Sequence, residues 1–426
     1  MYPFLPLRSR GFYPGLPSDQ FSDQWENPRD VFSVLLILGG DIVSRALAQL
    51  AGGRVTPVAF SFGWVAYAVT AVVSAVGENK LMPLPDCACK VINGRSGYAR
   101  DNSSWVVGRI MRDFDTWMDD GHPHGSIRHC LDDMINERWK QDRDEAGNGA
   151  AASQVPKPTM VGLCISVYRA RDVNPGSPGF DLAYCTGFGT ALVQLGIAAI
   201  PCVIHGDWGI VLVTAVGITL SFMTGALPQW ATEKWACRRH TKKTIILTRG
   251  NGSQHAIVII GDGKGIDLED LAAGQTNVDV SASSTTRIAI TILAAFWILL
   301  LITAAGIQHH TWYLLTVGGI GILQNIFVAG WPRFPKDLGV PLEFEKVIGK
   351  PKVMDALFEV EEEYPHVGRS MLDTFFPGKL RPGESRRWDD LEKKADAADE
   401  ERKRSRAAAQ TGPSSPEISH TQPLTS

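Results

Sequence analysis

The sequence lacks the motifs of several large enzyme families. It contains no GxxxxGK[ST] phosphate loop, no GxSxG nucleophile elbow, no HExxH zinc motif and no protein-kinase signature. Its two glycine-rich stretches, Gly250–Gly252 and Gly261–Gly265, therefore predict turns rather than a phosphate site. None of these motifs points to a cofactor, and the leading expectation is a non-catalytic chain.

The sequence also has few cysteines, and its first thirty residues do not have the pattern of a secretory signal. Seven cysteines in 426 residues are few and odd in number, which argues against a disulfide framework. Arg8 and Arg10 precede a polar, proline-rich stretch without a small-residue cleavage pattern, so residues 1–30 predict an irregular segment rather than a cleaved leader. The net charge of −3 gives no reason to expect nucleic acid as a partner.

The sequence does contain six long apolar runs. A helix rises about 1.5 Å per residue, so about 20 apolar residues cross a hydrocarbon core of about 30 Å. These runs predict an all-α transmembrane bundle of six spans, paired as three helical hairpins in segments 31–77, 182–227 and 288–330. The runs are Val31–Ala51, Pro57–Gly77, Leu182–Ile204, Trp208–Leu227, Ile288–Gly306 and Trp312–Gly330.

Lysine and arginine are distributed unevenly around these runs. The connections 205–207 and 307–311 contain neither, and 52–56 contains only Arg54. Residues 78–181 carry thirteen, residues 228–287 carry eight, and sixteen follow Gly330. Because basic residues concentrate on the cytoplasmic side of a membrane, six spans predict that both termini and both long loops are cytoplasmic, an N-in and C-in arrangement.

The two long loops predict a small cytoplasmic α+β layer. Thr244–Thr248 and Ala256–Ile260 are β-branched runs on either side of Asn251-Gly252, which indicates a hairpin, and Met160–Tyr168 is a candidate third strand. In loop 78–181, two apolar stripes at helical spacing predict amphipathic helices. We expect them to pack in a core rather than on the membrane surface. Their residues are Trp105, Val106, Ile110, Phe114, Trp117 and Met118, then Ile127, Cys130, Leu131, Met134, Ile135 and Trp139.

The segment after the last run divides by composition. Residues 331–376 predict a cytoplasmic region with a short helix at Val353–Glu362. Residues 377–426 are first highly charged and then rich in serine and proline, which predicts a disordered tail with at most a transient helix over Trp388–Ala409.

Asp41 and Arg45 are the most informative polar residues in the apolar runs. An ionisable residue at membrane depth is a functional hypothesis by default, and the i,i+4 spacing places the two side chains on one helix face. A self-neutralising structural pair is the favoured interpretation; the alternative is a polar transport path. The glycines of the third and sixth runs likewise allow either tight packing or an unwound substrate site.

Several cysteines and histidines gather in the loop 87–130. Cys87, Cys89, His122, His124 and Cys130 could in principle hold zinc, but the spacing contains no CxxC pair. The positions of Cys87, Cys89 and Cys237 near the inner ends of apolar runs make them candidates for lipidation, with plain reduced thiols as the leading interpretation.

Three stretches of the sequence resemble segments of uncharacterised multi-span membrane proteins of filamentous fungi. They are Asp86–Phe114, Trp235–Arg239 and Leu247–Gly261. The resemblance implies a fungal integral membrane protein and supplies no activity or functional residues.

These observations lead to three hypotheses about function. The leading one is a non-catalytic integral membrane protein whose partners are the lipid bilayer and a cytoplasmic protein bound at its α+β layer. The second is a transporter or channel with Asp41 and Arg45 on a polar path. The third is a membrane-associated enzyme that uses the Cys/His-rich loop 87–130.

Overall fold

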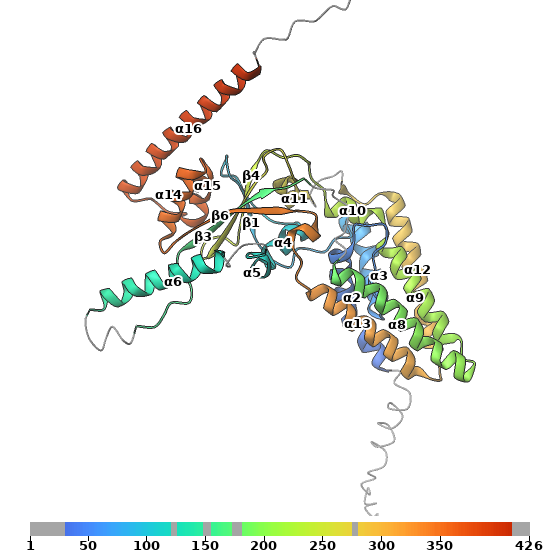
Figure 1. Ribbon diagram of the computed structural model, residues 1–426. Coiled ribbons are helices and arrows are strands. Elements are labelled where there is room, and N and C mark those ends of the chain that lie inside the picture. The colour runs from blue at the N-terminus through green and yellow to red at the C-terminus, as the bar shows by residue number, and fades with distance from the viewer. Residues whose placement is uncertain (1–29, 121–125, 148–154, 173–180, 275–279, 411–426) are drawn as a thin grey trace, which may run out of the picture.

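The computed structural model describes residues 30–120, 126–147, 155–172, 181–274 and 280–410. A helical bundle forms one part of the molecule and a domain built on a six-stranded sheet forms the other (Figure 1). The predictions for residues 1–29, for His122 and His124, and for the chain beyond residue 410 lie outside the described residues.

Six helices form the bundle as a closed ring, in which each helix packs against the next and the last returns to the first. In ring order they are α2 (Asp30–Leu50), α3 (Gly63–Val73), α12 (Ser284–Ala305), α9 (Gly209–Gly225), α8 (Leu182–His205) and α13 (Thr311–Gly330). The outward faces of α8, α9, α12 and α13 are apolar, with Leu192, Val203, Ile302 and Leu323 exposed. Such a surface is suited to lipid.

Three of these helices, α8, α12 and α13, are long and apolar enough to cross a membrane. A fourth span results if α9 and the short α10 (Pro228–Lys234), which meet at a 42° bend, count as one. Among the described residues the prediction of six spans is therefore not supported. Of the three predicted pairs, α2 packs with α3 and α8 with α9, but α12 packs mainly against α3 and α9 rather than α13.

The second apolar run differs most from its prediction. Residues 52–62 are not helical, and α3 with its final π-helical turn (Ser74–Glu78) is too short to be counted as a span. The Thr56 hydroxyl donates to the carbonyl oxygen of Gly225 at the sheet-domain end of the bundle. Phe60 lies beside Gly217 and Gly321 at mid-depth. The backbone N–H of Leu81 donates to the carboxylate of Glu233 on α10, again at the sheet-domain end. The run thus enters the ring from the sheet domain, turns at mid-depth and leaves on the same side.

The sheet has the strand order β2-β1-β4-β5-β3-β6 and is mixed, since β3 and β5 are parallel and the other neighbours are antiparallel. β4 and β5 form the hairpin that the two β-branched runs predict, and β3 is the expected additional strand. The strands are β1 (Lys90–Asn93), β2 (Ala99–Asp101), β3 (Leu163–Ala170), β4 (Thr244–Thr248), β5 (His255–Ile260) and β6 (Leu342–Lys350).

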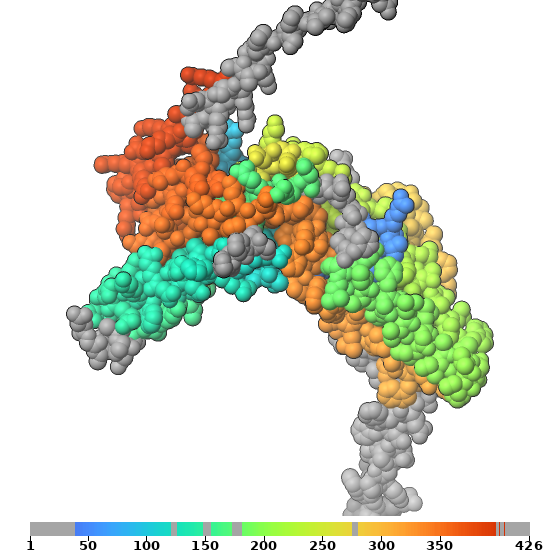
Figure 2. Space-filling model, viewed as in Figure 1, coloured from blue at the N-terminus to red at the C-terminus, as the bar shows by residue number. Residues whose placement is uncertain are grey.

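Helices cover both faces of the sheet. Alternate side chains of one strand therefore belong to different cores: Ile245 and Leu247 face one layer, and Ile246 faces the other. The first layer contains α4 (Trp105–Arg112), α5 (Phe114–Trp117), α6 (Ser126–Glu145) and α11 (Leu268–Ala273); the second contains α14 (Val353–Glu363), α15 (Val367–Phe375) and the start of α16 (Pro382–Gln410). The amphipathic helices of loop 78–181 accordingly pack in a core, and α6 projects from the domain (Figure 2).

Part of the predicted tail, Pro382–Gln410, forms α16, which includes the predicted transient helix over Trp388–Ala409. Trp388, Leu391 and Ala395 lie on one helix face and are buried, with the Trp388 ring 4.7 Å from the ring of Phe358. The average composition of the tail hides this short apolar stripe, which α14 covers.

Candidate functional site

The centre of the helix ring is filled by the chain itself. Asn325 of α13 accepts a hydrogen bond from the backbone N–H of Ala59 (3.1 Å) and donates one to its carbonyl oxygen (3.0 Å). Gln194 of α8 donates to the carbonyl oxygen of Phe60 at 2.7 Å. Non-helical backbone at membrane depth requires such partners, because lipid offers none.

Glycines on the surrounding helices give this segment its space. A Cβ at Gly187, Gly318 or Gly321 would collide with Pro57, Phe62 or the Phe60 carbonyl, respectively, whereas Gly189, Gly196 and Gly319 face open space. The small residues of α8 and α13 therefore serve close packing against the extended segment rather than helix–helix contact alone. Aromatic rings complete the filling: Trp297 stacks on Trp64 with centroids 5.2 Å apart.

The sequence-predicted pair lies elsewhere, on the outside of the ring. Arg45 Nε donates to Asp41 Oδ2 at 2.9 Å, and the two side chains are 46% and 71% exposed. This is the geometry of an i,i+4 pair that neutralises itself on one helix face. Neither residue faces the filled centre of the ring, where a polar path would have to run.

The remaining predicted residues do not converge. Burial raises the pKa of the Cys89 thiol and of the Cys237 thiol to about 12 each, which makes both poor nucleophiles, while Cys87 is half-buried. Cys130 lies on α6 beside Gly349 of β6. Within the described part of the chain, no three His, Cys, Asp or Glu side chains are grouped as metal ligands.

Buried basic side chains bond the ends of bundle helices where the bundle meets the sheet domain. Lys234 donates to the carbonyl oxygens of Gln49 and Ala51 at the C-terminal end of α2, at 2.9 and 2.8 Å. Arg109 of α4 donates to the carbonyl oxygens of Ala329 and Trp331 at the end of α13, and also pairs with Asp86. Cations at these positions satisfy the last carbonyls of each helix and complement its dipole.

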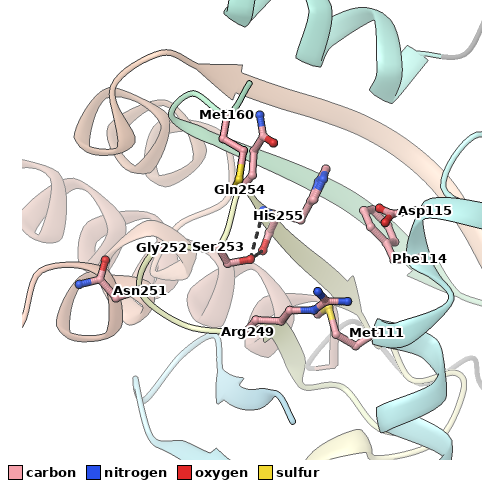
Figure 3. Close-up of a pocket in the computed structure, with 10 residues that line it drawn as sticks. All are labelled: Met111, Phe114, Asp115, Met160, Arg249, Asn251, Gly252, Ser253, Gln254 and His255. Carbon is pink, nitrogen blue, oxygen red and sulfur yellow. Dashed lines mark hydrogen bonds between the residues drawn. The ribbon is translucent and has the colours of Figure 1, made fainter. Parts of the chain in front are cut away.

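One cavity of the sheet domain lies at the loop between β4 and β5 (Figure 3). Its volume is about 350 Å³, within the range of small-molecule sites. The loop reverses direction over residues 249–254, with positive φ at Gly250 and Gly252, so it is longer than the two-residue turn that Asn-Gly suggests. The lining residues are Met111, Phe114, Asp115, Met160, Arg249, Asn251, Gly252, Ser253, Gln254 and His255.

Polar groups of three elements reach this cavity. His255 at the start of β5 packs edge-on against Phe114, with ring centroids 5.1 Å apart. Burial lowers the pKa of His255, the Asp115 carboxylate raises it and the Arg249 guanidinium lowers it, so the ring is neutral at pH 7. Its Nδ1 atom is buried and has no hydrogen-bond partner among the described residues.

The sequence alone does not predict this cavity. Residues 249–253 indicate only a turn, and Phe114 belongs to a predicted amphipathic helix in which Asp115 is the next residue. The one available signal was an arginine and a histidine at the two ends of a glycine-rich hairpin loop, which becomes a cavity only when α4 and α5 pack beside it.

Comparisons of this chain with protein-family models, with curated proteins and with solved structures find no match.

Proposed function

We propose that the chain is a membrane-anchored, non-catalytic binding protein. Its helical bundle serves as a closed anchor, and its sheet domain carries a ligand pocket. The observation that carries this proposal is the filling of the ring by Thr56–Phe62, whose backbone groups are bonded to Asn325 and Gln194.

The distribution of basic residues supports a cytoplasmic position for the sheet domain. The segments that build this domain contain nearly all lysines and arginines, while the connections 205–207 and 307–311 at the other end of the bundle contain none. The C-terminal region belongs to the same domain, because β6 pairs with β3.

A transporter is the second candidate. The observation in its favour is the non-helical segment at mid-depth, a feature of re-entrant loops and of the broken helices of transporters. The stacked rings of Trp64 and Trp297 and the close glycine contacts favour the anchor, because they leave the centre of the ring occupied.

Proteoliposomes containing the purified full chain test the choice. We expect vesicles loaded with potassium and a pH-sensitive dye to remain as tight as protein-free vesicles, with gramicidin as the positive control. We also expect no uptake of radiolabelled amino acids over hours. Ion leak or uptake above the protein-free rate would contradict the anchor and favour the transporter.

A further inference from the structure

Two side chains of opposite charge, Arg249 and Asp115, line the cavity at the β4–β5 loop without forming a salt bridge to each other. Arg249 follows the end of β4, and Asp115 belongs to α5, so the two side chains approach the cavity from different elements (Figure 3). Within the described residues no salt bridge joins them to each other or to a third side chain. Both charges act on His255, which lies in the same cavity lining.

The rest of the lining has an apolar side and a polar side. Met111 and Phe114 are buried side chains of the α4–α5 layer, and Met160 covers the cavity from the chain that precedes β3. A ligand can therefore place an apolar body against these three side chains. The unpartnered Nδ1 of His255 adds one polar position beside that apolar wall.

We propose that this cavity binds a small zwitterion with an apolar side chain, such as an aliphatic α-amino acid. Its carboxylate pairs with Arg249, its ammonium group pairs with Asp115, and its side chain lies against Met111, Phe114 and Met160. A ligand with one charge forms only one of these two pairs, which makes it the weaker ligand. This inference rests on the proposed binding function and names its ligand class.

Three probes with nearly the same carbon skeleton test the inference: leucine, 4-methylpentanoate and 3-methylbutylamine. Titration calorimetry on the full chain in detergent should show leucine binding about twofold to fivefold more tightly than either singly charged probe, because each lost pair with an exposed charge costs about that factor. Arg249→Gln should remove the advantage of leucine over the amine. Asp115→Asn should remove its advantage over the carboxylate.

Arg386→Gln and Asp390→Asn are matched controls, since they remove the same charges from exposed positions on α16. Both should bind leucine like the wild type. The inference is overturned if no probe binds, if all three bind equally, or if Arg249→Gln leaves leucine affinity unchanged. A leaking vesicle with intact leucine binding would instead contradict the anchor alone, so the two failures are distinguishable.

Discussion

Asp41 and Arg45 form a hydrogen-bonded ion pair on the outer face of α2. If the pair is structural, Asp41→Asn leaves Arg45 uncompensated at membrane depth, where a single charge costs at least about 2.5 kcal/mol. We therefore expect Asp41→Asn to lower the thermal midpoint and the membrane yield more than Asp41→Asn combined with Arg45→Gln. Such non-additivity is typical of groups in direct contact. Equal losses in the single and double variants would reject the pairing.

His255 gives the sheet domain a pH dependence whose sign follows from its environment. Burial lowers its pKa in the folded chain, so below about pH 6.5 the unfolded chain binds more protons than the folded one. Its contribution to stability is thus fully present above pH 6.5 and is lost as the pH falls towards the folded pKa. Thermal midpoints from pH 7.5 to 5 should fall less steeply in His255→Gln than in the wild type.

The exposed His129 of α6 supplies the control for the pH experiment. His129→Gln should keep the steep fall of the wild type. A His255→Gln curve parallel to the wild-type curve would show that another group causes the acid loss.

At the scale of elements, the extended segment and its glycine contacts can be tested by a matched pair of substitutions. Gly321→Ala places a methyl group against the Phe60 carbonyl, whereas Gly319→Ala, two residues away on the same helix, meets open space. Overpacking costs about 1–3 kcal/mol, and alanine favours a helix over glycine by about 1 kcal/mol. Gly321→Ala should therefore lower the thermal midpoint in detergent, and Gly319→Ala should leave it unchanged or raise it. Equal effects would contradict the re-entrant segment.

Elements with a local signal were predictable, and those that depend on distant partners were not. The β-branched runs around Gly250–Gly252 indicate β4 and β5, and the apolar stripe from Trp105 to Trp117 indicates α4 and α5. The apolar run Pro57–Gly77 carries no local sign that its first part is extended, since Gln194 and Asn325 on remote helices supply its hydrogen bonds. Likewise the cavity at Arg249 exists only through packing against Asp115 and its helix.

At the scale of the whole molecule, the run Pro57–Gly77 enters and leaves the bundle at the same end, which affects where the start of α2 lies relative to the sheet domain. α2 ends at the sheet domain, where Arg333 bonds the carbonyl oxygen of Gln49, while Gly39 packs at mid-depth against Gly63. Asp30, nine residues before Gly39, lies about 14 Å further from the domain at 1.5 Å per residue. The start of α2 and the sheet domain are therefore at opposite ends of the bundle.

This arrangement predicts opposite sides of the membrane for the segment before α2 and for the C-terminal region, in place of the N-in and C-in arrangement that six spans predict. Since basic residues favour a cytoplasmic sheet domain, a glycosylation acceptor fused ahead of Met1 should be modified, and one fused after Ser426 should not. The native sequons at Asn102 and Asn251 lie in the sheet domain and should also remain unmodified. A glycosidase-sensitive shift on a gel reports each site. Two unmodified fusions would mean that the run Pro57–Gly77 crosses the membrane after all, whereas a glycan at Asn102 with an unmodified N-terminal fusion would keep the re-entrant run and reverse the orientation.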